Sequence, residues 1–356
     1  MGKADTVRVG IVGLGGIGTH HADYVRDLGE TLVGGVDVAE SARDAFAAEY
    51  DVPTFETYAG LSDEGIDAVI VTTPNKFHEQ YVVEALETGV DVLCEKPLAH
   101  RLDSAERIAA AARDADGFCM VGFNNRFLPA VEVFKGYQER GRFGDVTHVE
   151  ANFVRRRGVP GRGGWFTTKE LSGGGSLIDI GVHAIDLALH FLDFPDLVEV
   201  SGQTRSAFGS RADYTYLDMW GEDGEESQFD VDDSVTAFVR TADGQTVSLE
   251  VAWATNRPPE HDFVVQGTDG GATLDRHAGD LTIHEVADVG DPHFTDTAVE
   301  TRDEPTHRRE LARFFEGVRA GEAPARNTVE QALDVQRVID AIYRSADAGS
   351  AVTLDQ

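Results

Sequence analysis

Short apolar runs alternate with segments of helical composition over the first third of the chain. The runs are continuous rather than alternating, as in strands of a parallel sheet that are buried on both faces. They predict strands at Val7–Val12, Thr31–Asp37, Ala68–Thr72, Val90–Cys94 and Phe118–Phe123. The segments between them predict helices at 17–28, Ala39–Tyr50, Phe77–Thr88 and Leu102–Arg113. This alternation predicts an α/β domain with a parallel sheet, right-handed crossovers and helices on both faces.

After about residue 126 the pattern changes to strands with one apolar and one polar face. A helix near 129–140 precedes Val146–Val154, which alternates as a half-solvated strand does. Asp243-Gly244 lies between two β-rich runs and is typical of a hairpin turn. Further strands are expected at Leu197–Thr204, Ser234–Thr241, Thr246–Ala254, Asp262–Gly267, Ala272–Asp275 and Leu281–Glu285. These runs predict an α+β domain with a large, mostly antiparallel open sheet.

The change of pattern divides the chain into three parts. Residues 1–126 form the first domain, and residues 127–326 form the second. Residues 327–356 contain an amphipathic helix at about 328–346, which we expect to pack back on the first domain. The stretch 207–230 is rich in Gly, Asp and Glu and weakly patterned, so we expect an exposed excursion there.

Acidic residues outnumber basic ones, with 63 Asp and Glu against 31 Lys and Arg, for a formal net charge of -32. The acids are spread along the chain, and only five of the basic residues are Lys. This composition favours a protein adapted to high salt, where carboxylates hold water and cations. A moderately acidic surface kept soluble by repulsion is the plainer alternative. Either surface repels phosphates, which argues against nucleic acid as a partner.

No apolar run approaches the roughly 20 residues of a membrane span. The start, Met1 to Asp5, leads directly into a strand-like segment and lacks the features of a secretory leader. We therefore expect a cytoplasmic protein with no membrane partner. Cys94 and Cys119 lie in apolar surroundings without zinc-type spacing, which favours two buried, reduced thiols.

The first predicted strand ends in a glycine-rich turn, Gly13-Leu14-Gly15-Gly16-Ile17-Gly18, that leads into a helix. In such a strand–turn–helix unit, Gly13 permits the tight turn and Gly15 lets the backbone approach a pyrophosphate. Gly18 allows close helix–strand packing, and the helix N-terminus receives the phosphate charge. This motif predicts a Rossmann-type domain that binds a dinucleotide, with Gly13, Gly15, Gly16, Ile17 and Gly18 at the cofactor.

Asp37 ends the next strand, 19 residues after Gly18. An acid at this place accepts hydrogen bonds from the adenosine ribose and repels a 2′-phosphate, which favours NAD over NADP. Val38 and Ala39 beside it offer no cation. One alternative is that Arg43 reaches a 2′-phosphate, but at its helical spacing we expect a solvated surface residue.

Three segments together resemble the Gfo/Idh/MocA family, named for glucose–fructose oxidoreductase and inositol dehydrogenase. They are the glycine turn, Cys94-Glu95-Lys96-Pro97 at a strand end, and the run Gly173 to His183 with its Asp-x-x-x-His element. Similarity also covers Thr73-Pro74-Asn75 through His78, Gly122-Phe123-Asn124 and the last helix, so it spans nearly the whole chain.

The resemblance implies a two-domain enzyme with its active site between the domains. Lys96 matches the family's substrate-binding and catalytic lysine, and Asp179 and His183 match its catalytic pair. The residues that would line the nicotinamide and its ribose are Thr73, Pro74, Asn75, His78, Glu95, Lys96 and Asn124, with Trp165 in a loop that approaches the nicotinamide in related enzymes.

General chemistry is consistent with these roles. Oxidation of a secondary alcohol removes the hydroxyl proton as hydride leaves the carbon, and His183 is a suitable base. Asp179 is four residues from His183, so both face one side of a helix. Lys96 follows the carboxyl end of a parallel strand, where ligands bind in open α/β sheets. Its ammonium stabilises alkoxide charge and lowers the pKa of a nearby imidazole.

Several polar residues have plainer interpretations. Asp186 and His190 continue the stripe of Asp179 and His183, but hydride transfer needs no metal, so we expect packing or capping roles and no metal site. His20-His21 is expected to be structural, near the phosphate end of the cofactor site. Asn124-Asn125-Arg126 departs from the family's Asn-Arg-Arg run. Arg155-Arg156-Arg157 is either a surface strand end or a binding site for an anionic or polyhydroxylated substrate.

The sequence therefore predicts an NAD-dependent oxidoreductase that acts on a cyclic polyol or sugar, such as inositol or a hexose. One alternative is a non-catalytic sensor that retains the nucleotide domain. Another is an enzyme that holds its cofactor permanently and cycles between two sugars. Relatives cover the exposed sheet face with another subunit, so we expect a homodimer or homotetramer.

Overall fold

The computed structural model describes residues 6–217, 223 and 228–354. The chain separates into two compact units. The first contains Met1–Asn124 together with Pro305–Gln336, and the second contains Asn125–Glu304 together with Arg337–Gln356. Each unit has its own sheet.

The first unit is built on a six-stranded sheet with the order β3-β2-β1-β4-β5-β6. Every neighbouring pair is parallel. Its strands are β1 (Arg8–Val12), β2 (Thr31–Val36), β3 (Thr54–Phe55), β4 (Ala68–Val71), β5 (Asp91–Glu95) and β6 (Cys119–Gly122). This is the doubly wound order, in which connections leave the neighbouring strands β1 and β4 in opposite directions. The predicted parallel α/β domain is confirmed.

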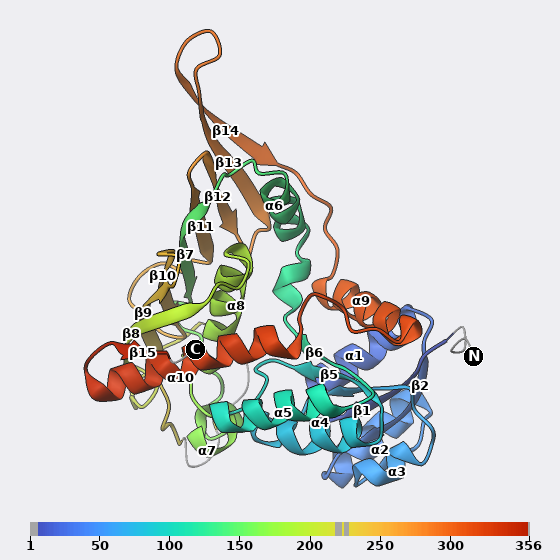
Figure 1. The fold of residues 1–356 in the computed structure, drawn as a ribbon. Helices are drawn as coiled ribbons and strands as arrows, with labels where there is room; N and C mark the ends of the chain where they lie inside the picture. Colours follow the sequence, from blue (N-terminus) through green and yellow to red (C-terminus); the bar gives the residue numbers. More distant parts are fainter. Residues whose placement is uncertain (1–5, 218–222, 224–227, 355–356) are drawn as a thin grey trace. The chain divides into compact units, whose positions relative to one another are not determined.

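Helices flank this sheet (Figure 1). They are α1 (Gly16–Asp27), α2 (Glu40–Tyr50), α3 (Tyr58–Ser62), α4 (His78–Glu87), α5 (Leu102–Asp114) and α9 (Thr306–Ala320). Helices α4 and α5 pack against each other, and α1 packs against α9. The four residues of β4 have no exposed surface, which explains why the strand is apolar without interruption.

Helix α9 and the segment after it are fastened to strand β6. Phe314 of α9 packs against Phe118 with ring centroids 5.8 Å apart. Asn327 donates from its side chain to the Val121 carbonyl oxygen, and its own carbonyl oxygen accepts from the Val121 amide at 2.9 Å. Buried Glu310 accepts from the same Asn327 side chain at 3.1 Å. The sequence pattern did not predict α9, nor the short elements β3 and α3.

The second unit is built on a nine-stranded sheet with the order β14-β13-β12-β11-β7-β10-β9-β8-β15. Strands β7 and β10 are parallel, and all other neighbours are antiparallel, as predicted for a mostly antiparallel sheet. The strands are β7 (Val146–Val154), β8 (Leu197–Arg205), β9 (Ser234–Thr241), β10 (Thr246–Ala252), β11 (Asp262–Gly267), β12 (Gly270–Asp275), β13 (Asp280–Ala287), β14 (His293–Val299) and β15 (Val352–Thr353).

One face of this sheet is covered and the other is open. The helices are α6 (Pro129–Glu139), α7 (Lys169–Ser172) and α8 (Val182–Phe191), with α10 (Val329–Ala348), inside which the boundary between the units falls. Helix α8 packs across β7. Phe191 of α8 meets Phe263 of β11 and Phe134 of α6, with centroids 6.0 and 4.6 Å apart. Strands β14 and β15 were not predicted.

Two further expectations concern less regular parts of the chain. The predicted excursion at 207–230 has no helix or strand in its described part; residues 218–222 and 224–227 lie outside the described residues. Within the part of the chain that the structure describes, none of the helices combines the length and the apolar composition that a bilayer crossing requires.

Candidate functional site

The glycine turn lies where β1 ends beside β4, at the point where the connections diverge. Gly13 has a φ of +96°, and a side chain there would meet the Thr72–Thr73 peptide at 2.8 Å. A Cβ on Gly18 would lie 2.0 Å from the Gly13 carbonyl oxygen. The Thr72 hydroxyl donates to this same oxygen at 2.6 Å. Both glycines are therefore required by close backbone packing.

Gly15 and Gly16 differ from these two glycines, because a Cβ built on either meets no described atom within 4 Å beyond its chain neighbours and its own helix backbone. Ile17 beside them is exposed. The buried Thr73 hydroxyl oxygen, just past the end of β4, has no hydrogen-bond partner within the described residues. An open glycine turn at a helix N-terminus with an unused hydroxyl beside it fits the phosphates of a dinucleotide.

The Asp37 carboxylate turns back toward the glycine turn. Its Oδ2 accepts from the Leu14 amide at 2.9 Å, and its Oδ1 accepts from the Ala39 amide at 2.8 Å. Arg43 is only half-exposed and donates to the carbonyl oxygens of Asp37 and Val38 at 2.7 and 3.1 Å. Arg43 keeps part of its side chain at the surface, as expected, while its guanidinium binds the backbone at the end of β2.

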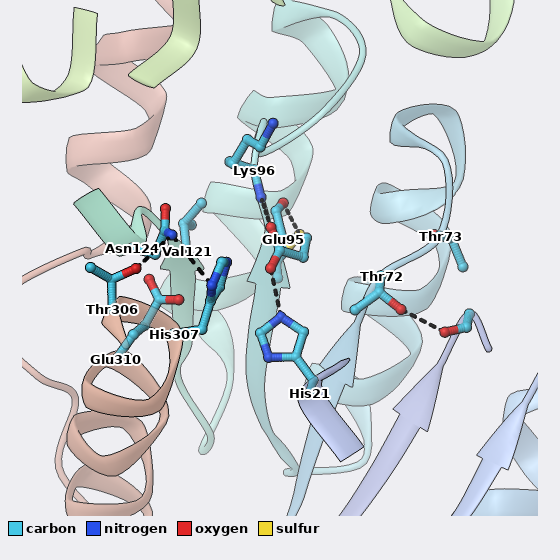
Figure 2. A network of polar contacts seen from close by, with 12 residues as sticks. His21, Thr72, Thr73, Glu95, Lys96, Val121, Asn124, Thr306, His307 and Glu310 are labelled. Atoms are coloured by element: carbon cyan, nitrogen blue, oxygen red, sulfur yellow. Dashed lines mark hydrogen bonds and ion pairs between the residues drawn. The ribbon is translucent and has the colours of Figure 1, made fainter. Parts of the chain in front are cut away.

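A buried network surrounds Glu95 at the carboxyl end of β5 (Figure 2). His21 of α1 donates from Nε2 to Glu95 Oε1 at 2.6 Å. Glu95 Oε2 accepts from the Lys96 amide at 3.1 Å. Burial alone raises the pKa of Glu95, but the hydrogen bond and charge of His21, with smaller effects of His307 and Lys96, lower it to about 2. Glu95 is therefore a carboxylate at neutral pH, directly beside half-buried Lys96.

His307 and Asn124 continue this network toward α9 (Figure 2). The Asn124 side-chain amide donates to Thr306 Oγ1 at 3.0 Å and to His307 Nδ1 at 3.4 Å. The His307 ring meets the rings of His20 and His21 edge-on. Burial lowers the pKa of His307 to about 4, so its ring is neutral at physiological pH.

The segment after β4 places Asn75 and His78 in the interior. Asn75 begins the 3-10 helix η1 (Asn75–Phe77), after half-buried Pro74, and both Asn75 and His78 are almost fully buried. His78 Nδ1 lies 2.9 Å from the Pro97 carbonyl oxygen and Nε2 lies 2.8 Å from that of Thr73. Burial lowers the pKa of His78, although the two backbone contacts raise it. The buried ring lies between the loop after β4 and the loop after β5, and in its neutral form it donates to only one of the two oxygens.

In the second unit, Asp179 lies in a π-helical turn, η4 (Leu177–Gly181), which leads into α8. Such turns are often found at functional sites. The indole of Trp253, directly after β10, donates to Asp179 Oδ2 at 2.9 Å, so the buried carboxylate has a fixed orientation. His183 follows in the first turn of α8 and is half-buried.

The approach to this turn is held by Asp232. Its Oδ1 accepts from the Gly175 amide at 2.9 Å and the Tyr343 hydroxyl at 2.7 Å. Its Oδ2 accepts from the Ser176 hydroxyl and the Leu177 amide at 2.8 and 2.9 Å. Four hydrogen bonds on one buried carboxylate make the glycine run that precedes Asp179 rigid.

Asp186 has the packing role expected of it. It forms a fully buried ion pair with Arg126 at 2.5 Å, and the Arg126 guanidinium lies 4.6 Å from the Phe194 ring centroid. Arg126 is therefore a structural residue.

Trp165 lies in the 3-10 helix η3 (Trp165–Thr167), stacked on Phe166 with centroids 3.7 Å apart. Among the described residues, no three His, Cys, Asp or Glu side chains gather as a metal ion requires.

The structure thus gathers the predicted residues into two groups. The glycine turn, Asp37, the loop after β4, Glu95, Lys96 and Asn124 surround the carboxyl edge of the first sheet. Asp179, His183 and Trp165 belong to the second unit. The sequence interpretation expected a structural role for His21 without pairing it with Glu95, and it missed His307, Asp232 and Trp253. Each acts through a partner far along the chain, so no local motif pointed to it.

The first unit defines a dinucleotide-binding domain of the Rossmann class. A family model described as "Oxidoreductase family, NAD-binding Rossmann fold" matches residues 7–123, and one described as "GFO/IDH/MocA C-terminal domain" matches residues 134–273. The chain belongs to the Gfo/Idh/MocA family of oxidoreductases.

Curated relatives cover almost the whole chain. D-glucoside 3-dehydrogenase of Escherichia coli (strain K12) is 30% identical over 354 residues, 98% of this chain and 97% of the relative. D-xylose 1-dehydrogenase (NADP(+)) 2 of Haloferax volcanii is 30% identical over 352 residues, 97% of this chain and 99% of the relative. The solved structure of levoglucosan dehydrogenase with NADH and levoglucosan has a TM-score of 0.86 at 22% identity, covering 99% of this chain and 100% of that chain.

The glycine turn allows a test with a matched control. Gly18→Ala should lower the stability of the ligand-free protein by about 1–3 kcal/mol, because its Cβ would overlap the Gly13 carbonyl oxygen. Gly16→Ala should leave it unchanged or slightly higher, because the space is open and alanine favours the helix. Thermal unfolding measures both, and equal melting temperatures would contradict the packing role of Gly18.

Proposed function

We propose that this protein is an NAD-dependent dehydrogenase that oxidises a secondary hydroxyl of a cyclic polyol or sugar. The observation that carries the proposal is the grouping of the open glycine turn, Asp37 and the Glu95–Lys96 pair at one edge of a parallel sheet. Such an edge is where open α/β sheets bind cofactors. Relatives that act on glucosides and xylose support a sugar-type substrate.

Three side chains of this chain carry the proposed chemistry, while the bound nicotinamide supplies the hydride acceptor. His183 takes the hydroxyl proton as the base. Lys96 donates a hydrogen bond to the substrate oxygen and stabilises its developing negative charge. Asp179, held by Trp253, lies on the helical turn before His183 and orients the imidazole and the substrate.

Removal of the Lys96 or His183 side chain should lower turnover without weakening cofactor binding. Lys96→Ala and His183→Ala are each expected to lower kcat by about 10²–10⁴-fold, the usual contribution of general acid–base groups. The affinity for NADH, measured by fluorescence titration, should stay within a few-fold of the unmodified protein. Exposed Lys169 and His293 provide matched controls as Lys169→Ala and His293→Ala. Near-normal turnover of Lys96→Ala would refute the proposed role.

A substrate panel separates this proposal from its two alternatives. Sugars, polyols and sugar acids are supplied with NAD or NADP, and absorbance of the reduced cofactor is followed from low salt to multimolar KCl. Activity that rises with salt supports the high-salt adaptation suggested by the net charge of -32. Tight NADH binding without turnover of any substrate would favour the sensor. Purified protein that carries stoichiometric nucleotide would favour the permanently loaded enzyme.

The cofactor preference depends on the Asp37 charge. Asp37→Asn keeps an acceptor oxygen for only one of the Leu14 and Ala39 amides, and it removes the charge that repels a 2′-phosphate. The ratio of kcat/KM with NADP to that with NAD should rise by about tenfold or more, which is about 1.4 kcal/mol. Asp44→Asn, an exposed acid on α2, is the control. An unchanged ratio would show that Asp37 does not set the preference.

We propose that the open face of the second sheet pairs with another copy of this chain in a homodimer or homotetramer. Phe238 of β9, Val286 of β13 and Phe294 of β14 share this face by strand register and are 42%, 73% and 84% exposed. Apolar residues on an open sheet face are typical of an interface.

A charged residue in the middle of that face tests the assembly. Phe238→Asp should shift the protein to a smaller species in sedimentation velocity, because the carboxylate would be buried without a partner. Val38→Asp, at an exposed apolar site of the first unit, should not change the mass. If Phe238→Asp and the unmodified protein have the same mass, this face is not the interface.

A further inference from the structure

The edge of the second sheet that carries Asp179 also carries an arginine pair. Strands β7 and β10 are parallel neighbours, so both end at this edge. Trp253 follows β10 and holds Asp179. Arg155 follows β7, and its amide donates to the Ala252 carbonyl oxygen at 2.8 Å. The backbone of Arg155 is therefore bonded to Ala252, the residue before the Trp253 that holds Asp179.

Strand register shows which face of the sheet this pair occupies. Phe263, which packs on Phe191 of α8, is the register partner of Ala151. Phe153 is two residues further along β7, so its side chain lies on the same face, nearer the end of the strand. Phe153 is buried at the end of the sheet where the Asp179 turn meets β10.

Two guanidinium groups lie over the ring of Phe153. The Cζ atoms of Arg276 and Arg155 are 4.1 and 5.6 Å from its centroid. Arg276 follows β12, and its amide donates to the His261 carbonyl oxygen at 3.0 Å. Its Nη1 reaches Asn125 Oδ1 at 3.5 Å. Asn125 precedes the Arg126 that pairs with Asp186 of α8, so Arg276 is close to the helix that carries His183.

Neither guanidinium of this arginine pair forms an ion pair within the described residues, although the charge of Asp275 raises the pKa of Arg276. No carboxylate there lies within 4 Å of either guanidinium, although acids outnumber bases two to one. The Asp275 carboxylate is occupied by the amides of His277 and Ala278. The buried Arg276 Nε has no hydrogen-bond partner among the described residues. Burial, and then the charge of Arg155, lower the pKa of Arg276 to about 10.

The other two arginines of the run are engaged differently. Arg157 donates to the carbonyl oxygens of Arg156 and Thr255 and lies 4.7 Å from the Phe208 ring centroid, so it is structural. Arg156 is exposed. His261 meets Phe153 edge-on, and burial with the nearby arginines lowers its pKa to about 4. The imidazole is neutral at physiological pH and does not add to the charge.

We propose that Arg155 and Arg276 bind the carboxylate or phosphate group of an anionic sugar, while a secondary hydroxyl of the same sugar meets Asp179 and His183. A guanidinium donates paired hydrogen bonds to either oxyanion, and two of them beside one aromatic ring form a positive site for one such group. The inference rests on the proposed dehydrogenase function and names its substrate class.

The test compares neutral sugars with anionic counterparts of the same ring. Glucose, glucuronate and glucose 6-phosphate form one set, and galactose, galacturonate and galactose 6-phosphate form another. The unmodified protein should have a kcat/KM at least about tenfold higher for the preferred anionic member than for the neutral one. The uronate and phosphate arms show which oxyanion the site accepts.

Variants assign that preference to the two arginines. Arg276→Met and Arg155→Met should each lower kcat/KM for the anionic sugar by about tenfold to a hundredfold, mainly through KM, and leave the neutral sugar and NADH binding unchanged. Arg276→Lys keeps the positive charge but loses the paired donors of the guanidinium. Its kcat/KM for the anionic sugar should lie between those of the unmodified protein and Arg276→Met. Arg156→Met is the matched control. Arg155 is less enclosed, so its variant remains informative if Arg276→Met fails to fold.

Two results would overturn the inference. In the first, the unmodified protein turns over neutral sugars as well as or better than their anionic counterparts. In the second, the Arg155 and Arg276 variants lose activity equally on both kinds of sugar. Either leaves the dehydrogenase proposal intact. Absence of turnover on every neutral and anionic sugar, with both cofactors, would instead contradict the proposed function on which the inference rests.

Discussion

The close approach of α1 to the end of β1 is the constraint on which the first unit depends. It exists because Gly18 has no side chain to displace the Gly13 carbonyl oxygen, and the Thr72 hydroxyl then fixes that oxygen from the neighbouring strand. With α1 in this position, His21 reaches Glu95 on β5. The same backbone packing that shapes the glycine turn therefore also orients the Glu95 carboxylate beside Lys96.

Most of the regular structure could be predicted because its pattern is local. Buried strands such as β4 are continuous apolar runs, and Asp243-Gly244 lies between β9 and β10 as a hairpin turn requires. Helix α9 was missed although Leu311, Phe314, Phe315 and Val318 have helical spacing, because charged residues dilute the run. Strand β14 is exposed along almost its whole length and has no regular apolar alternation, so pairing with β13 rather than composition makes it a strand.

The candidate site could be predicted where a residue's place in a local motif is enough to identify its role. The glycine turn, Asp37, Glu95 and Lys96 are of this kind. The groups that orient them were not, because orientation depends on contacts between distant segments. His307 reaches Asn124 across 183 residues, and Trp253 reaches Asp179 across 74. Their pairing is a property of the fold, and a single sequence contains no pattern for it.

The arginines of this acidic chain differ in whether a carboxylate pairs with them, and sequence spacing does not reveal this difference. Arg126 is paired with Asp186 in the interior, Arg142 with Glu285, and Arg162 with Asp223. Arg155 and Arg276 instead share an aromatic ring without a carboxylate among the described residues. Like charges that repel each other weaken the fold unless an anion relieves the repulsion. Such an arrangement, at the edge that holds Asp179, is better explained by a ligand than by stability.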